Sequence, residues 1–141
     1  MSLITIAEFR EIIQESLTLA AMMGVEVTDI GPGRATARMP FQSNILRPGG
    51  TVSGPALMGL ADFAAYAVVL SAVGRVELAV TTNLNINFLR KPAPAAVIAE
   101  GSMLKLGKRL AVTEVALFTE GDPEMVAHAT ATYSIPPPEK R

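Results

Sequence analysis

The stretch that decides the fold runs from Pro48 to Gly74 and reads PGGTVSGPALMGLADFAAYAVVLSAVG. Its glycines, Thr51 to Ser53 and Pro55 form a tight loop that leads directly into an apolar segment. Ser53 or Gly54 can cap a helix at this point, and proline suits a first helical turn. The stretch therefore predicts a loop followed by a long helix, from Pro55 to about Val73.

Asp62 is the only charged residue between Pro48 and Gly74. A carboxylate is costly to bury without a partner, so a lone one in an apolar helix indicates a function. The alternative is a structural Asp62 held by hydrogen bonds. The first backbone N–H groups of the helix are free and can bind a developing oxyanion, two turns before Asp62. The loop and the carboxylate together favour a catalytic site.

The rest of the chain alternates between helical and strand patterns. Thr5 and Glu8 form a capping box ahead of a helix that we expect to reach about Met22. The strand-like runs are Val25 to Ile30, Arg34 to Met39, Leu78 to Leu89, Ala96 to Leu106, Leu110 to Thr119 and Met125 to Ile135. The order αββαββββ predicts an α+β fold in which an antiparallel sheet wraps around the long helix. We expect one domain over residues 1–141, with 136–141 as a short tail.

The composition narrows the function classes. The formal net charge is −1, which does not suggest nucleic-acid binding, and there is no cysteine for disulfides, thiolate catalysis or metal binding. The N-terminus does not resemble a signal peptide, and Asp62 interrupts the longest apolar run before it reaches a membrane span of about 18 residues. We therefore expect a cytoplasmic protein without membrane contact. A hydrophobic fraction of 50% suggests self-association.

Several motifs together resemble a known family. Gly50-Thr51-Val52-Ser53-Gly54-Pro55 stands where that family has Gly-x-x-His-Gly-Gly, and Asp62 follows nine residues after Ser53. The resemblance continues through Thr81 to Pro92, Lys105 to Leu110 and Ala127 to Tyr133. The chain is thus similar to the hotdog-fold acyl-CoA thioesterases of the phenylacetate-pathway (PaaI-like) type.

The resemblance implies roles for individual residues. Asp62 would be the general base or nucleophile, the Gly54 backbone N–H the oxyanion hole, and Thr81 would help to place the attacking water. Ser53 replaces the family's His, which orients the thioester carbonyl, and a serine hydroxyl can still donate a hydrogen bond. Asn44 is the candidate for the family's Asn, although it lies nine residues before Ser53 and the family residue usually lies six before its His.

The resemblance also implies partners. Coenzyme A would enter as part of the substrate, with no further cofactor. The basic residues Arg90, Lys91, Lys108 and Arg109, at the ends of predicted strands, could bind its phosphates. The active site would be shared between subunits of a homodimer or homotetramer, the loop of one facing the helix of another.

Some residues invite a structural interpretation. Alternation places Val80, Leu84 and Ile86 on one face of their strand and Thr81 on the other, together with a row of asparagines. His128 is the only histidine and is more typical of a structural residue. With no second histidine, no cysteine and no carboxylate cluster, we expect no metal site.

Two alternatives to hydrolysis remain open. Because Ser53 replaces the family's His, the chain could be a non-catalytic hotdog domain that binds acyl-CoA or lipid. The other alternative is a lyase of the enoyl-CoA hydratase type, which is less favoured because that chemistry relies on an Asp/His pair.

Overall fold

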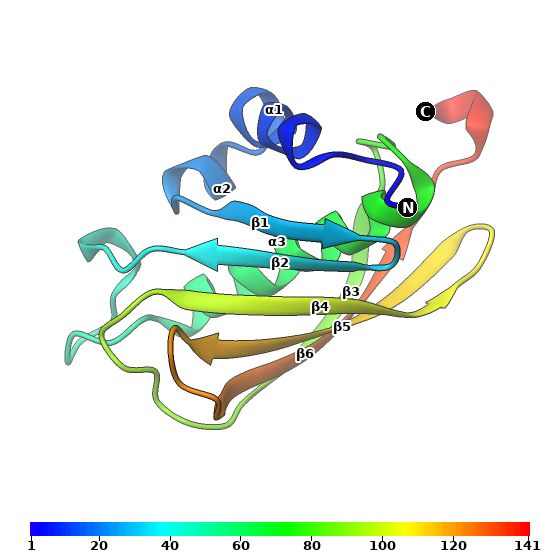
Figure 1. Cartoon of the computed structure of the whole chain (residues 1–141). Helices are drawn as coiled ribbons and strands as arrows, with labels where there is room; N and C mark the ends of the chain where they lie inside the picture. Colours follow the sequence, from blue (N-terminus) through cyan, green and yellow to red (C-terminus); the bar gives the residue numbers. More distant parts are fainter.

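The computed structural model describes residues 1–141. One six-stranded antiparallel sheet curls around the long helix α3 (Figure 1). The elements are α1 (Ile6–Ser16), α2 (Thr18–Met22), β1 (Glu26–Gly31), β2 (Arg34–Met39), α3 (Gly54–Val73), β3 (Val80–Phe88), β4 (Val97–Leu106), β5 (Leu110–Thr119) and β6 (Met125–Ser134), with single 3-10 turns at Ser43–Ile45 and Pro138–Lys140. The strand order in the sheet is β1-β2-β4-β5-β6-β3. The predicted α+β class and hotdog arrangement are confirmed.

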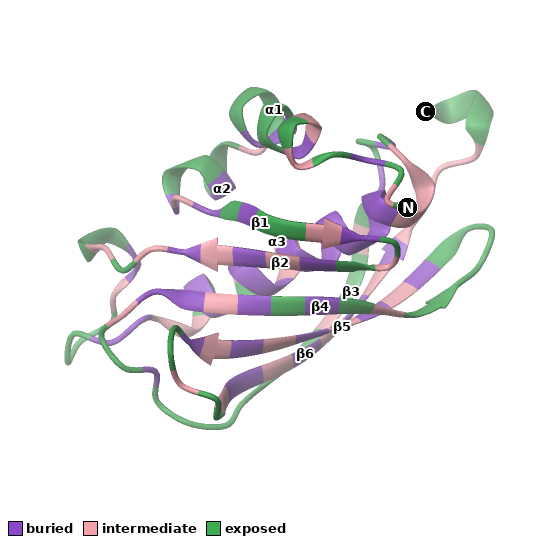
Figure 2. Ribbon diagram, viewed as in Figure 1, coloured by how far each residue is buried: buried purple, intermediate pink, exposed green.

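Helix α3 begins after a serine N-cap and ends before a glycine, as its sequence predicts. The Ser53 side chain accepts a hydrogen bond from the Ala56 N–H, and Gly74 at φ 89° follows the last residue. The helix is apolar all round, which is typical of a helix enclosed by other elements. Gly101 of β4 allows the sheet to approach closely, because a Cβ there would lie 2.8 Å from the Val68 side chain. Figure 2 shows the resulting buried layer between α3 and the sheet.

The expectation that no segment is long and apolar enough to cross a membrane is wrong. By length and composition alone, α3 (Gly54–Val73) qualifies. The single carboxylate of Asp62 does not lower the mean hydropathy of the helix enough to exclude it. The sheet explains this apolarity, because 67% of the relevant window is buried inside the protein.

The predicted first helix is broken. The capping box forms as expected, with the Glu8 N–H donating to the Thr5 hydroxyl (3.1 Å) and the Thr5 N–H to the Glu8 carboxylate (3.1 Å). Leu17 then leaves the helical conformation at φ −105° and ψ 68°, and α2 starts directly after it. Apolar spacing alone predicted one continuous helix, since Leu17 and Ala20 keep the helical period. The break instead turns Leu17 toward the cavity that contains Asp62.

Strand β3 lies at an edge of the sheet and contains a bulge. Thr81 pairs with Tyr133 of β6 and Asn83 pairs with Thr132, so Thr82 is an extra residue. The bulge reverses the alternation, and Thr81 therefore points toward α3, on the same face as the partly buried Leu84. The predicted placement of Thr81 on the face of the asparagines is wrong for this reason.

Candidate active site

Asp62 lies on the side of α3 that faces the start of β3. Its carboxylate oxygen Oδ1 accepts a hydrogen bond from the Thr81 hydroxyl (2.7 Å) and another from the Tyr133 hydroxyl (2.7 Å). The Tyr133 hydroxyl also lies 2.9 Å from the backbone oxygen of Asp62. These contacts leave Oδ2 of Asp62 without a hydrogen-bond partner in the protein, so one carboxylate oxygen is held and the other is open to a ligand.

The two tyrosines beside Asp62 stay protonated. Burial, followed by the nearby Asp62 carboxylate, raises the pKa of Tyr133 well above its ordinary value. Burial, followed by the Glu77 carboxylate, raises the pKa of Tyr66 to about 12. The Tyr133 hydroxyl is therefore a hydrogen-bond donor toward Asp62 at neutral pH.

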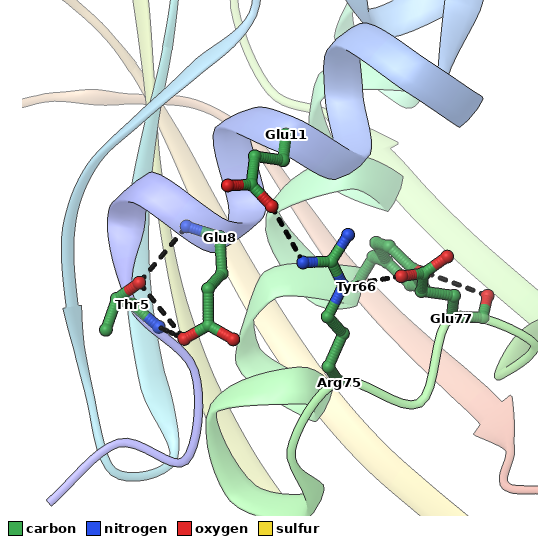
Figure 3. A network of polar contacts seen from close by, with 6 residues as sticks. All are labelled: Thr5, Glu8, Glu11, Tyr66, Arg75 and Glu77. Atoms are coloured by element: carbon green, nitrogen blue, oxygen red, sulfur yellow. Dashed lines mark hydrogen bonds and ion pairs between the residues drawn. The ribbon is translucent and has the colours of Figure 1, made fainter.

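A small cavity of about 150 Å³ adjoins Asp62. Leu17, Phe63 and Val80 give it apolar walls, and Tyr66 and Glu77 also line it. Figure 3 shows how one wall is fixed: the Tyr66 hydroxyl donates to the backbone oxygen of Glu77 (2.8 Å).

An arginine ties α1 to the same wall. The Arg75 guanidinium bonds the Glu77 carboxylate (2.5 Å) and the Glu11 carboxylate of α1 (2.9 Å), as Figure 3 also shows. Exposed ion pairs contribute little to stability because water and salt screen them, so the bridge positions α1 more than it stabilises the fold.

A second cavity, of about 390 Å³, lies at the other end of β3. Gly54 and Leu57 of the first turn of α3 line it, together with Phe88, where β3 ends. Three cations, Arg47, Arg90 and Lys91, also line it, and no acidic residue does. This cavity combines a helix N-terminus with positive side chains and so favours an anionic ligand.

The loop before α3 holds this cavity in shape. Leu46 and Val52 form an isolated antiparallel bridge, and the Arg47 N–H donates to the Thr51 backbone oxygen (2.9 Å). Gly49 and Gly50 supply the turn, at φ 100° and 80°, in the left-handed region that favours glycine. The backbone N–H of Gly54, at the first helical position, has no intrahelical acceptor and is available to a ligand.

Comparison with known proteins identifies the architecture. A sequence model of the thioesterase superfamily matches residues 49–126, which include the loop, α3, Asp62 and Thr81. The chain belongs to the thioesterase superfamily. It is a thioester hydrolase with a hotdog fold.

Individual relatives agree with this assignment. A protein assigned as a thioesterase from Silicibacter sp. TM1040 is 40% identical, with a TM-score of 0.87, and the match covers 97% of this chain and 95% of that one. A mutant of the phenylacetic acid degradation protein PaaI from Thermus thermophilus is 25% identical, with a TM-score of 0.73, over 83% of this chain and 97% of that one. A protein of Thermoplasma acidophilum assigned as an esterase is 31% identical over 110 residues, which are 78% of this chain and 82% of that protein.

Within one thioesterase protomer the predicted catalytic residues fall into separate places. Asp62 and Thr81 are in direct contact, whereas Gly54 lines the other cavity. Ser53 caps α3, since its oxygen accepts the Ala56 N–H (3.3 Å). Asn44 is exposed, donates to the Met22 backbone oxygen (3.3 Å) and lines neither cavity.

The predicted phosphate-binding residues are also divided. Arg90 and Lys91 line the Gly54 cavity, and Arg90 is paired with Glu124 and, at 3.8 Å, with Asp122. Lys108 and Arg109 lie in the β4–β5 turn, beside the end of β6 that pairs with Val80. Strand β3 separates these two ends by roughly 26 Å at about 3.3 Å per residue. The four cations therefore do not form one cluster in a single protomer.

Three residues at the site escaped the sequence analysis. Arg47 lies six residues before Ser53, so the family's usual spacing pointed to Arg47 instead of Asn44. Thr51 is 8% exposed, and its hydroxyl has no hydrogen-bond partner although the residue lines the Gly54 cavity. Tyr133 belongs to an alternating run of inward residues that continues to Ile135, and nothing in that pattern indicated that its hydroxyl would reach Asp62.

Proposed function

We propose that this thioesterase hydrolyses acyl-CoA at a site shared by two protomers, with Asp62 as general base or nucleophile and the Gly54 N–H as oxyanion hole. The observation that carries the proposal is the placement of these two residues at opposite ends of the edge strand β3. Neither half is a complete hydrolytic site by itself.

Pairing of β3 with a second copy would complete the site. β3 pairs only with β6, so its other edge is free, and its terminal residues Val80 and Phe88 are 57% and 52% exposed. In an antiparallel pair related by a two-fold axis, the start of one β3 lies beside the end of the other. The Asp62 half of each protomer then meets the Gly54 half of its partner.

The proposed reaction uses Oδ2 of Asp62 on one half of the site and the Gly54 N–H on the other. Oδ2 of Asp62 accepts a proton from a water molecule as the water oxygen attacks the thioester carbon, or attacks that carbon itself. The carbonyl oxygen becomes an oxyanion, which the Gly54 N–H and the N-terminus of α3 stabilise. The tetrahedral intermediate expels the CoA thiolate, which takes up a proton. If water attacked, the product acid leaves directly. If Asp62 attacked, a mixed anhydride of Asp62 and the acyl group remains, and a water molecule hydrolyses it to release the acid and regenerate Asp62.

The charges suggest how the substrate lies. Arg47 and Lys91 beside Gly54 suit the phosphates of CoA, whereas the apolar side chains of Leu17 and Phe63 suit an acyl group. The same two-fold pairing brings the Lys108 turn of the partner toward the Arg90 end. Cations that are separated within one protomer thus approach each other across the dimer.

A non-catalytic binding function is the second candidate. Ser53, which replaces the family's histidine, is engaged as the N-cap of α3 through its oxygen. A protein without the orienting imidazole could retain acyl-CoA without hydrolysing it. Thiol release from a panel of acyl-CoAs by the purified protein tests the proposal. Binding without thiol release would support the second candidate, and loss of a double-bond absorbance would instead identify a lyase.

We expect the enzyme to be active only as a dimer or larger assembly. Light scattering at micromolar concentration should give at least twice the protomer mass of 14.9 kDa. On dilution, activity per protomer should fall together with the dimer fraction, because each monomer carries two incomplete sites. A compact monomer with undiminished activity would contradict the shared site.

Replacing Ser53 by alanine should lower both activity and stability. If the hydroxyl proton orients the thioester carbonyl, kcat should fall by a factor that corresponds to about 1–3 kcal/mol. Loss of the N-cap should lower the free energy of unfolding by about 0.5–2 kcal/mol. Ser53→Gly separates these effects, since glycine costs only a few tenths of a kcal/mol as an N-cap. Unchanged kcat in both variants would limit Ser53 to capping.

A further inference from the structure

We infer that Tyr133 is a positioning residue for Asp62, fixing the orientation of its carboxylate; this role rests on the proposed function of Asp62. Tyr133 lies on β6, and its side chain is 3% exposed. Tyr133 lines the Asp62 cavity, but its hydroxyl is directed at Asp62, and it therefore acts through that carboxylate.

The register of the sheet brings two donors to the same oxygen. Thr81 and Tyr133 are directly paired across β3 and β6, and both hydroxyls lie 2.7 Å from Oδ1 of Asp62. Hydrogen bonds to a carboxylate are short and stronger than those between neutral groups. Tilting of the Asp62 carboxylate would break both bonds, so the carboxylate is held with one oxygen toward the two hydroxyls and the other without a protein partner.

The Tyr133 hydroxyl also holds the helix. Its 2.9 Å contact with the backbone oxygen of Asp62 ties α3 to β6 at the residue that reacts. Thr81 has no such contact with the helix backbone. Because burial and the Asp62 carboxylate raise the pKa of Tyr133, the hydroxyl keeps its proton and donates over the working pH range.

The aromatic neighbours keep Tyr133 in place. Its ring lies 5.9 Å from the ring of Tyr66, which in turn lies 5.7 Å from the ring of Phe9 in α1. Tilted pairs at these distances are favourable packing arrangements. Removal of only the hydroxyl oxygen of Tyr133 should therefore leave the ring position unchanged and test the two contacts of the hydroxyl with Asp62.

The test is Tyr133→Phe, measured with an acyl-CoA that the wild-type protein hydrolyses. A positioning role predicts that kcat falls about 10- to 100-fold, as for loss of a hydrogen bond to a charged group, while KM changes by less than about 2-fold. Thr81→Val removes the other donor to Oδ1 and should show the same separation of kcat from KM. If Tyr133→Phe does not fold, Thr81→Val still tests whether hydrogen bonds to Oδ1 position Asp62.

The control is Thr113→Val. The Thr113 hydroxyl is likewise buried and donates to the Ala131 backbone oxygen (3.0 Å), between β5 and β6, and it forms no hydrogen bond with Asp62. The Thr113→Val substitution should lower the free energy of unfolding and leave kcat unchanged. Wild-type kcat in folded Tyr133→Phe, or an equal loss of kcat in the control, would overturn the inference. A wild-type protein that hydrolyses no acyl-CoA would instead overturn the proposed function, and this inference with it.

Discussion

Asp62→Asn should abolish thioester hydrolysis, with a loss of rate on the order of 10² to 10⁴. An amide is nearly the same size as the carboxylate, and its oxygen can still accept the hydrogen bonds of Thr81 and Tyr133. The variant lacks only a group that can take up a proton or attack the thioester carbon. Rates of thiol release at saturating acyl-CoA measure the effect.

The fold should survive this substitution. Asp62 forms no salt bridge in the protomer and is only half-buried, so the thermal midpoint should change little. A matched control is Asp29→Asn, on the exposed β1–β2 hairpin, where the carboxylate pairs with Arg34 far from either cavity. It should retain full activity. Full activity of Asp62→Asn would show that the mechanism proposed for Asp62 is wrong.

Much of the fold could be predicted because local signals agreed with the tertiary structure. The N-cap at Ser53, the glycine after α3 and the alternating runs each placed an element within a residue or two. Two local features were hidden. The break at Leu17 places this residue at the cavity that Asp62 also lines, and the bulge at Thr82 appears only in the pairing with β6. Neither the break nor the bulge changes the hydrophobic periodicity of the sequence, so the sequence did not predict them.

The site was only partly predictable for a related reason. Asp62 was visible because an unpaired carboxylate in an apolar helix is conspicuous in a sequence. Tyr133 was not, because a tyrosine at the end of an inward-facing strand is ordinary core composition. The separation of Arg90 from Lys108 within one protomer was not visible, because sequence order does not show to which end of an antiparallel sheet a turn belongs.

Gly54→Pro should remove the oxyanion hole while preserving the helix. Proline is tolerated at the first helical position, and Ser53 at φ −73° and ψ 155° already has the extended conformation that a residue before proline requires. The backbone N–H is lost, and the proline ring is added on the cavity wall beside Phe88. Loss of one oxyanion-hole donor lowers kcat by about 10²- to 10³-fold, and we expect a decrease of that size. Gly54→Ala is the control, since it keeps the N–H and its Cβ would lie 3.4 Å from Phe88 Cζ.

The same variant tests whether the site is shared. In a mixed dimer of Asp62→Asn and Gly54→Pro protomers, one site combines both defects and the other combines the intact Asp62 with the intact Gly54. Random mixing makes half of the dimers mixed, so about a quarter of the wild-type activity should return when two nearly inactive proteins are refolded together. If both residues acted within one protomer, every site in the mixture would carry a defect. In that case no activity would return, and the pairing of β3 proposed for this thioesterase would lose its support.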